Sequence, residues 1–456
     1  MDDMPRVLTL SLGCDKNLVD SEYMLGALHA RGYAFTGDET EATAAVINTC
    51  CFIHDAKEES LDAVAYFAAL REQGILKALI VTGCLAQRMR GKLHEQFPSV
   101  DAILGTASID KIADALDLAL SGRKQDFFED INRSFKIPGK RVLSTGGVTA
   151  YLKIAEGCDK RCTYCVIPSL RGKYRSTDID TLVDEARMLD AQGVRELILV
   201  AQETTRYGVD LYGKKSLATL LKRLCDETAG IAWIRLLYCY PEEIDEDLIR
   251  VIREEKKIVK YLDIPVQSGS DAVLARMGRH TTNAEIRALV NRLRNEIPGI
   301  CLRTTLISGF PGETASDHRA TKELVRDLCF DRLGVFTYSR EDGTVAGNMD
   351  GQIKEPLKKR RRTEIMKLQQ EISYAHASRT VGTVTDVLVE GELEEDDEGN
   401  TVYAARTYRD APDVDGLLFF TGKRKHYMSG DLVRVRVTRA EAYDLIGEEE
   451  IDESAE

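Results

Sequence analysis

The chain has 456 residues, of which 43% are hydrophobic and 30% are charged, and its formal net charge is −13. This composition is typical of a globular protein with two or three domains, and no apolar run is long enough to cross a bilayer. The acidic balance argues against broad adhesion to nucleic acid and favours a basic partner. Eleven cysteines in a chain without a secretory pattern indicate thiolate ligands and buried thiols in a cytoplasmic protein.

The first part of the chain alternates strand and helix patterns, which predicts an α/β domain on a parallel sheet. The expected strands cover residues 6–13, 44–48, 78–83 and 102–105. The expected helices cover residues 19–31, 57–72 and 86–96.

Each of the first three expected strands ends in a cysteine, namely Cys14, Cys50 and Cys84. Because parallel strands share one carboxyl edge, these thiols can meet in space and hold a cluster with one iron lacking a protein ligand. Cys51 makes the second ligand ambiguous, and the strand register favours Cys50. The alternative is a set of buried structural thiols. The sequence indicates that role for four other cysteines: Cys225, Cys239, Cys301 and Cys329.

Cys158, Cys162 and Cys165 are spaced as C-x3-C-x2-C on one loop. Three thiolates at this range can hold three irons of a four-iron cubane and leave the fourth iron open for a substrate or cofactor. Structural zinc is the alternative, but it usually takes four ligands in paired C-x2-C units, and no second pair lies nearby. We therefore expect a catalytic cluster on this loop.

A polar stretch at residues 123–147 is the expected linker to a second α/β series. Six strand–helix units predict a partial β/α barrel, whose active site lies at the carboxyl edge of the strands. The loop with Cys158 follows the first of these strands. The expected strands cover residues 151–155, 196–201, 233–238, 261–265, 302–307 and 332–338, with helices such as 181–192 and 283–295 between them.

The last part of the chain begins after a basic run at residues 358–362, which we interpret as a solvated helix face, with RNA contact as the alternative. Short alternating segments at 383–390, 402–407, 416–420 and 432–440 predict a small β-barrel. Eleven acidic residues and two arginines lie between residues 386 and 420, a net charge of −9. Such a surface repels phosphate backbones and attracts a lysine- and arginine-rich partner.

The C-x3-C-x2-C motif, with Tyr164 before its third cysteine, resembles the radical S-adenosylmethionine superfamily. The resemblance implies that Cys158, Cys162 and Cys165 hold a catalytic 4Fe-4S cluster whose open iron binds S-adenosylmethionine. Reductive cleavage would then give a 5′-deoxyadenosyl radical that abstracts hydrogen from a C–H bond. Seven residues are candidates for contacts to S-adenosylmethionine: Tyr164, Gln202, Glu203, Gln267, Ser268, Arg303 and Gly309. The alternative role for any one of them is that of a packing residue, a helix cap or a turn glycine.

Residues 11–22, 48–50 and 82–87 resemble the N-terminal domain of methylthiotransferases, and residues 309–314 and 336–344 match the same family. This resemblance implies that Cys14, Cys50 and Cys84 hold an auxiliary 4Fe-4S cluster. Its open iron would carry sulfide or polysulfide as the sulfur source.

The last domain resembles the TRAM domain, and residues 405–416 resemble methylthiotransferases that modify the β-carbon of an aspartate in protein twelve of the small ribosomal subunit. That basic protein is the implied partner, with an electron donor such as flavodoxin or ferredoxin. The acidic surface argues against a nucleic acid substrate and against the closest alternative, a tRNA adenosine methylthiotransferase of the MiaB type. A non-catalytic iron–sulfur scaffold or redox sensor is the alternative from another class. The expected domains cover residues 5–122, 144–375 and 378–447.

Overall fold

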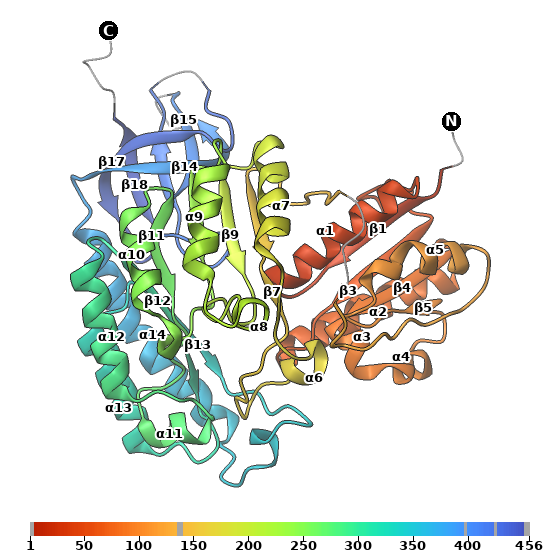
Figure 1. The fold of residues 1–456 in the computed structure, drawn as a ribbon, viewed down its shortest axis with the longest axis horizontal. Helices are drawn as coiled ribbons and strands as arrows, with labels where there is room; N and C mark the ends of the chain where they lie inside the picture. Colours follow the sequence, from red (N-terminus) through yellow and green to blue (C-terminus); the bar gives the residue numbers. More distant parts are fainter. Residues whose placement is uncertain (1–3, 135–139, 396–398, 424–425, 451–456) are drawn as a thin grey trace.

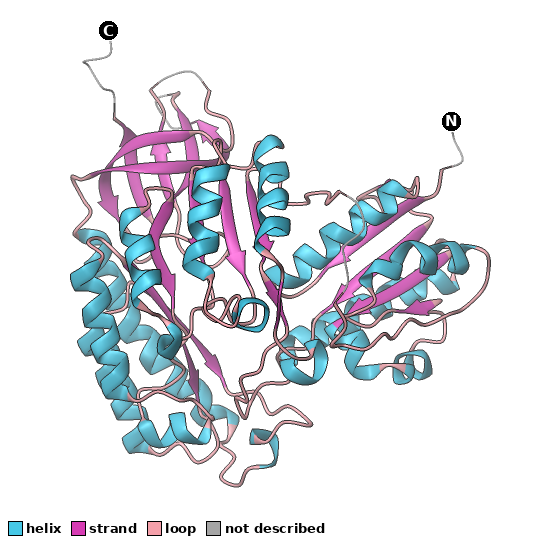
Figure 2. Cartoon of the chain, in the orientation of Figure 1, coloured by secondary structure: helices cyan, strands magenta, loops and turns pink. Residues whose placement is uncertain are grey.

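The computed structural model describes residues 4–134, 140–395, 399–423 and 426–450 (Figure 1). Along the chain it forms a five-stranded parallel sheet, a six-stranded parallel sheet and a closed five-stranded barrel. In Figure 2 the helices of the middle unit lie along the outer side of its curved sheet. In the described parts of the chain, no helix combines the length and the apolar character needed to cross a membrane.

The N-terminal sheet has the order β2-β1-β3-β4-β5, and all its strand pairs are parallel. The strands β3 and β4 are buried along their whole length because helices cover both faces of the sheet. On β4, Ile80 packs into one core, whereas Leu79 and Val81 pack into the core on the opposite face. The strands are β1 (Arg6–Ser11), β2 (Ala34–Phe35), β3 (Ala44–Thr49), β4 (Ala78–Gly83) and β5 (Ala102–Ile103). The helices are α1 (Asp15–Ala30), α2 (His54–Glu72), α3 (Cys84–Met89), α4 (Gly91–Gln96) and α5 (Ile112–Leu120).

The expected single helix over residues 86–96 is wrong, because α3 and α4 are separated at Arg90. Arg90 has φ +49°, which a continuous right-handed helix does not allow. Its guanidinium lies 5.2 Å from the centre of the Phe128 ring, so the break turns this side chain onto an aromatic face.

The central sheet is open and has the order β6-β9-β10-β11-β12-β13, with every pair parallel. This confirms the expected partial barrel. Its strands are β6 (Thr149–Lys153), β9 (Glu196–Val200), β10 (Trp233–Leu236), β11 (Ile258–Asp263), β12 (Cys301–Ser308) and β13 (Arg332–Thr337). The main helices are α7 (Ile179–Ala191), α9 (Leu217–Glu227), α10 (Glu246–Glu254), α12 (Asn283–Glu296), α13 (Ala315–Leu328) and α14 (Glu355–Ser378). Shorter elements are β7 (Ala155–Glu156), β8 (Arg175–Ser176), α6 (Ile167–Arg171), α8 (Val209–Tyr212) and α11 (Asp271–Arg276).

The C-terminal barrel closes in the order β14-β15-β16-β18-β17. Its strands are β14 (Val384–Glu395), β15 (Thr401–Thr407), β16 (Leu418–Thr421), β17 (Leu432–Ala440) and β18 (Leu445–Glu449). Arg406, at the end of β15, forms an ion pair of 2.6 Å with Glu196 and donates to Thr149 Oγ1 at 3.3 Å. Glu196 and Thr149 begin β9 and β6. The barrel therefore covers the amino edge of the central sheet and leaves the carboxyl edge for a site.

One hydrophobic core joins all three units inside the curve of the central sheet. Val19 and Tyr23 of α1 belong to the same buried cluster as Ile198 and Trp233 of the central strands. Leu388 of β14 also belongs to this cluster. Burial of these side chains fixes the position of the N-terminal unit against the open side of the barrel.

Candidate functional site

The loop with the C-x3-C-x2-C motif lies between β7 and α6, at the carboxyl edge of the central sheet. Cys158 N–H donates to Gly172 O at 3.1 Å, and Cys165 N–H donates to Cys162 O at 3.0 Å, so backbone bonds fix the loop. Gly157 has φ +78°, and a Cβ there would lie 2.1 Å from the backbone oxygen of Lys173. Only glycine fits this turn.

Burial disfavours the thiolate form of these cysteines. It raises the pKa of Cys158 and of Cys165 to about 12, and the negative charge of Cys162 contributes to both shifts. Thiols with such pKa values keep their protons at neutral pH unless a metal takes the proton's place. The trio fits an iron–sulfur centre because its donors are three thiols on one loop, and a bound cluster would hold them as thiolates.

The second trio lies at the carboxyl edge of the N-terminal sheet. Cys14 precedes α1, Cys50 follows β3 and Cys84 begins α3. Burial raises the pKa of Cys50 to about 11, with further contributions from the charges of Cys84 and Cys14. Gly13 has φ +93°, and a Cβ there would lie 2.6 Å from Cys50 Sγ. Because Gly13 has no side chain, Cys50 can lie directly against the loop that carries Cys14.

The two neighbouring cysteines differ in their surroundings. Cys51 is fully buried in the core below the sheet edge, and burial raises its pKa to about 12. Cys84 and Arg88 are the charges that act on Cys51 most strongly, whereas Cys50 responds to both Cys84 and Cys14. The contact of Cys50 with Gly13, next to Cys14, and the place of Cys51 in the hydrophobic core favour Cys50 over Cys51 as the third member of the trio.

Within the described residues, no three Cys, His, Asp or Glu side chains converge on a point that suits a single metal ion. A four-iron cubane binds each thiolate at a different iron, so its ligands lie farther apart than those of one ion. Both trios consist of thiols alone, which are the donors that such clusters take.

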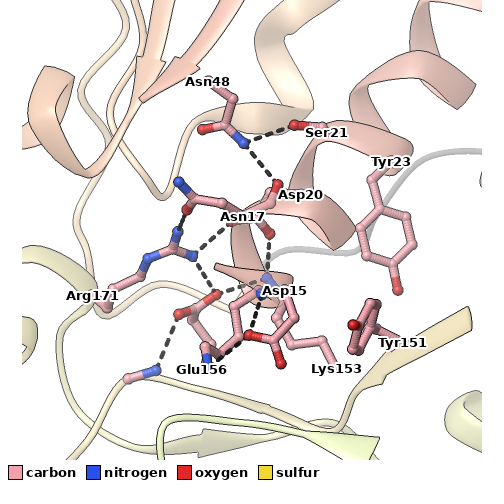
Figure 3. A network of polar contacts seen from close by, with 12 residues as sticks. Asp15, Asn17, Asp20, Ser21, Tyr23, Asn48, Tyr151, Lys153, Glu156 and Arg171 are labelled. Carbon is pink, nitrogen blue, oxygen red and sulfur yellow. Dashed lines mark hydrogen bonds and ion pairs between the residues drawn. The ribbon is translucent and has the colours of Figure 1, made fainter. Parts of the chain in front are cut away.

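A buried polar network joins α1 to residues that flank the C-x3-C-x2-C loop (Figure 3). Arg171, the last residue of α6, donates to Asp20 Oδ2 of α1 at 2.7 Å and to Glu156 Oε2 at 3.0 Å. It also bonds Asn17 Oδ1. Lys153 pairs with Asp20 and, at 2.8 Å, with Glu156. Two cations and two carboxylates from both domains thus meet beside the cysteines.

Three of the candidate S-adenosylmethionine contacts present buried oxygens that accept no hydrogen bond from the described residues: Gln202, Glu203 and Gln267. Gln202 donates its amide to Glu156 Oε1 at 3.0 Å, so its carbonyl oxygen is the free acceptor. Burial raises the pKa of Glu203 to about 7, although Lys160 lies 3.7 Å away and opposes the shift. Gln267 has φ +70°, an uncommon conformation for a non-glycine residue.

The other candidates have different surroundings. Tyr164 packs against Phe310 with ring centres 6.4 Å apart, and Gly309 N–H donates to Glu313 Oε2 at 3.0 Å. The hydroxyl of Ser268 lies 3.4 Å from that of Thr321 on α13.

Arg303 lies toward the other end of its strand from Gly309. It pairs with Asp263 at 2.9 Å and with Asp415 of the C-terminal barrel at 3.6 Å. Gly309 directly follows β12, and six residues of strand span roughly 20 Å. The structure does not bring Arg303 and Gly309 together.

Sequence reasoning missed two arginines next to the catalytic loop. Arg279 lies 4.1 Å from the centre of the Tyr240 ring, and Tyr240 Oη lies 3.7 Å from Cys162 Sγ. Arg276 O accepts from Thr163 Oγ1 at 2.8 Å. The guanidiniums of Arg276 and Arg279 each keep two buried nitrogens without a hydrogen bond to a described residue. Their spacing as Arg-x-x-Arg around Met277-Gly278 was the available signal.

The interpretation of residues 358–362 as a solvated helix face is wrong for two of the five residues. Lys358 is buried, and its Nζ donates to Tyr338 O at 2.7 Å. Arg361 is buried and pairs with Glu313 at 2.7 Å. Arg361 therefore holds the turn after β12 in place, and Lys358 holds the end of β13.

Comparison with known proteins agrees with this architecture. Residues 6–105 match the uncharacterized protein family UPF0004, residues 152–325 match the radical SAM superfamily, and residues 381–449 match the TRAM domain. The radical S-adenosylmethionine methyltransferase TsrM from Kitasatospora setae has a similar fold. Its TM-score is 0.53 at 15% identity, and the match covers 75% of this chain and 74% of TsrM.

Two bacterial relatives extend the similarity to nearly the whole chain. Ribosomal protein uS12 methylthiotransferase RimO from Lachnoclostridium phytofermentans is 52% identical over 97% of this chain and 99% of its own length. The protein of the same name from Desulforamulus reducens is 46% identical over 98% of this chain and 99% of its own. The chain therefore belongs to the RimO family of radical S-adenosylmethionine methylthiotransferases.

Proposed function

We propose that this enzyme adds a methylthio group to the β-carbon of an aspartate of ribosomal protein uS12. Relatives that span the chain carry this substrate in their names. The observation that carries the proposal is the placement of two cysteine trios on either side of one buried network, because methylthio transfer to a carbon radical requires both a radical source and a sulfur source.

In this proposal Cys158, Cys162 and Cys165 hold one 4Fe-4S cluster, and Cys14, Cys50 and Cys84 hold the auxiliary one. Bound there, the clusters supply the electron that cleaves S-adenosylmethionine and the sulfide or polysulfide that is transferred. The remaining residues of the site bind S-adenosylmethionine and orient it. Glu203, Gln267 and Gln202 offer buried acceptor oxygens to the cationic and hydroxyl groups of S-adenosylmethionine. The domain bounds proposed for this arrangement are residues 5–122, 144–375 and 378–447.

An acidic strand end supports a basic protein as the substrate. Glu392, Glu394 and Glu395 are exposed at the end of β14, and residues 396–398, which belong to the same acidic run, lie outside the described residues. A cluster of carboxylates attracts a lysine- and arginine-rich surface and repels a phosphate backbone. We call Glu392, Glu394 and Glu395 the acidic ledge.

Two of the acidic residues counted in this domain are paired inside the protein. Asp410 pairs with Arg332, and Asp415 accepts from Tyr261 Oη at 2.7 Å and lies 3.6 Å from Arg303. Both carboxylates stabilise the contact with the central barrel and offer no charge to a partner. The substrate argument therefore does not include these two carboxylates.

Three exposed arginines on the neighbouring strand β17 favour the second candidate, a tRNA methylthiotransferase: Arg434, Arg436 and Arg439. Acidic residues oppose at least two of them, since Arg436 pairs with Glu450 and Arg439 pairs with Glu441. This pairing weakens the attraction for phosphate.

A direct assay separates the two substrates. The reconstituted enzyme is given S-adenosylmethionine, a flavodoxin or ferredoxin as electron donor, and either purified uS12 or tRNA. Mass spectrometry is expected to find the methylthio increment on the uS12 aspartate only. An increment on tRNA with none on uS12 would overturn the proposal.

Neutralising the ledge tests its role in recognition. The variant Glu392→Gln, Glu394→Gln, Glu395→Gln is expected to weaken uS12 binding by roughly tenfold at low salt, and the loss is expected to shrink at high salt. The matched control removes three exposed carboxylates from α9 and α10, as Asp226→Asn, Asp247→Asn, Glu254→Gln. Equal losses in both variants would show that only the net charge matters.

A further inference from the structure

The short helix α6 belongs by sequence to the catalytic loop and by packing to the N-terminal domain. It begins two residues after Cys165. Val166 and Leu170 lie in the buried core that also contains Cys51 and Cys84, and Leu170 O accepts from Thr106 Oγ1 at 2.6 Å. The segment that follows one cluster loop is therefore anchored beneath the other cluster site.

Arg171 ends this helix and connects to the auxiliary site through Asn17. Asn17 Nδ2 donates to Leu12 O and to Thr49 O, both at 3.0 Å, and these carbonyls precede Cys14 and Cys50 by one or two residues. Asn17 Oδ1, which accepts from Arg171, lies 4.0 Å from Cys84 Sγ. The amide of Asn17, which is drawn in Figure 3 beside Arg171, thus contacts all three segments that bear the auxiliary cysteines.

The other side of the same guanidinium connects to the catalytic loop. Arg171 pairs at 3.0 Å with Glu156, which lies two residues before Cys158. Glu156 Oε1 also accepts from the backbone N–H of Gly157 at 3.2 Å. The side chain of Arg171 is 2% exposed, so its position is fixed on all sides.

From this geometry we propose that Arg171 is a positioning residue. It sets the separation and orientation of the two cysteine trios and holds a positive charge beside the auxiliary cluster. Burial and multiple charge-assisted bonds make a planar guanidinium a rigid connector, which a flexible ammonium does not replace. A nearby cation also favours the more negative, reduced form of a cluster and raises its reduction potential. The inference rests on the proposed function, because it assigns a cluster to each trio.

The test compares Arg171→Gln and Arg171→Lys with Arg141→Gln. Arg141 is a matched control because its side chain is 3% exposed and pairs with Glu22 and Glu185 across the same domain boundary. Its charge partners are carboxylates and Tyr23 instead of the candidate cysteines. Loss of either arginine is expected to destabilise the boundary, which thermal unfolding measures. Iron content is measured first in each variant.

Three readouts then report on the clusters. Pulsed EPR on the full chain gives the distance distribution between the two reduced clusters. Redox titration in a chain with Cys158, Cys162 and Cys165 replaced by alanine gives the potential of the auxiliary cluster alone. The ratio of 5′-deoxyadenosine to methylthio product gives the coupling of the radical to sulfur transfer.

Arg171→Gln is expected to broaden the distance distribution, lower the auxiliary potential and raise the 5′-deoxyadenosine ratio roughly tenfold, as misplacement of reacting groups does. Arg171→Lys keeps the charge and is expected to retain the potential while still broadening the distances. Arg141→Gln is expected to change none of the three. Parental values in Arg171→Gln with both clusters bound, or the same changes in Arg141→Gln, would overturn the inference. A trio that binds no iron in the parent would instead overturn the proposed function.

Discussion

Two boundaries join the central domain to its neighbours, and buried arginines stabilise both. At the N-terminal boundary, Arg171 and Lys153 meet Asp20 and Glu156 beside the cysteines. At the C-terminal boundary, Arg235 and Arg406 enclose Glu196, with both Arg235 and Glu196 fully buried. The first network lies at the carboxyl edge of the barrel and borders the site, whereas the second closes the amino edge. Buried ion pairs therefore border the candidate site at one edge and join the C-terminal barrel to the central sheet at the other.

Loss of either trio is expected to give the largest effect. Replacing Cys158, Cys162 and Cys165 by alanine is expected to abolish formation of 5′-deoxyadenosine, because in the proposed function these thiols hold the cluster that reduces S-adenosylmethionine. Replacing Cys14, Cys50 and Cys84 is expected to leave that formation intact and abolish methylthio transfer. Chromatography of the nucleoside product and mass spectrometry of uS12 measure both. Nucleoside formation that survives loss of the central trio would refute its role.

Gly13→Ala is expected to remove the auxiliary cluster and leave the catalytic one. The new Cβ would lie 2.4 Å from Cys50 Cβ, so the cysteine has to move. Gly32→Ala is the matched control, because Gly32 has a similar φ of +97° but open space around it. Iron content is expected to fall by roughly half only in Gly13→Ala. Equal losses in both variants would attribute the effect to backbone strain.

Glu196→Gln addresses the C-terminal boundary. It leaves Arg235 buried without its carboxylate and Arg406 with Glu390 alone, which is expected to lower the free energy of unfolding by about 3 to 5 kcal/mol. Denaturant unfolding measures this loss. The absorbance and EPR spectra of both clusters are expected to stay unchanged, since the network lies at the edge away from the cysteines. A changed cluster spectrum would remove the distinction between the two boundaries.

Glu203→Gln is expected to give the smallest effect, which depends on pH. Because burial raises the pKa of Glu203 to about 7, the folded state favours its protonated form. This preference stabilises the folded state fully at pH values below 4.5, which is the ordinary pKa of a glutamate. The stabilisation is lost as the pH rises toward 7. In the metal-free protein, the melting temperatures of variant and parent are expected to agree near pH 4, and the variant to be more stable at pH 8. A difference that does not vary with pH would contradict the raised pKa.

The sequence predicted the order of strands well because their apolar patterns are local. The six central strands and the three cysteines at the N-terminal sheet edge lie where alternation and strand ends placed them. The strand β18 was missed, because its residues Leu445–Glu449 are short and end in a charged pair.

Pairings between distant residues could not be predicted. Asp20 and Arg171 are 151 positions apart, and neither differs by pattern from a surface residue of an amphipathic helix. Likewise, the sequence suggests solvated charges at Asp415 and Lys358. In the structure Asp415 pairs with Arg303 of the central barrel, and Lys358 packs against Gly309. Their burial follows from how the domains dock, which no local pattern encodes.

The central claim is that each trio holds its own four-iron cluster. Anaerobic reconstitution followed by iron counting and Mössbauer spectroscopy tests it most directly, in the parent chain and in the two triple-alanine variants. The account predicts about eight irons in the parent and about four in each variant, all in cubane clusters. About four irons in the parent, or zinc in either trio, would contradict it.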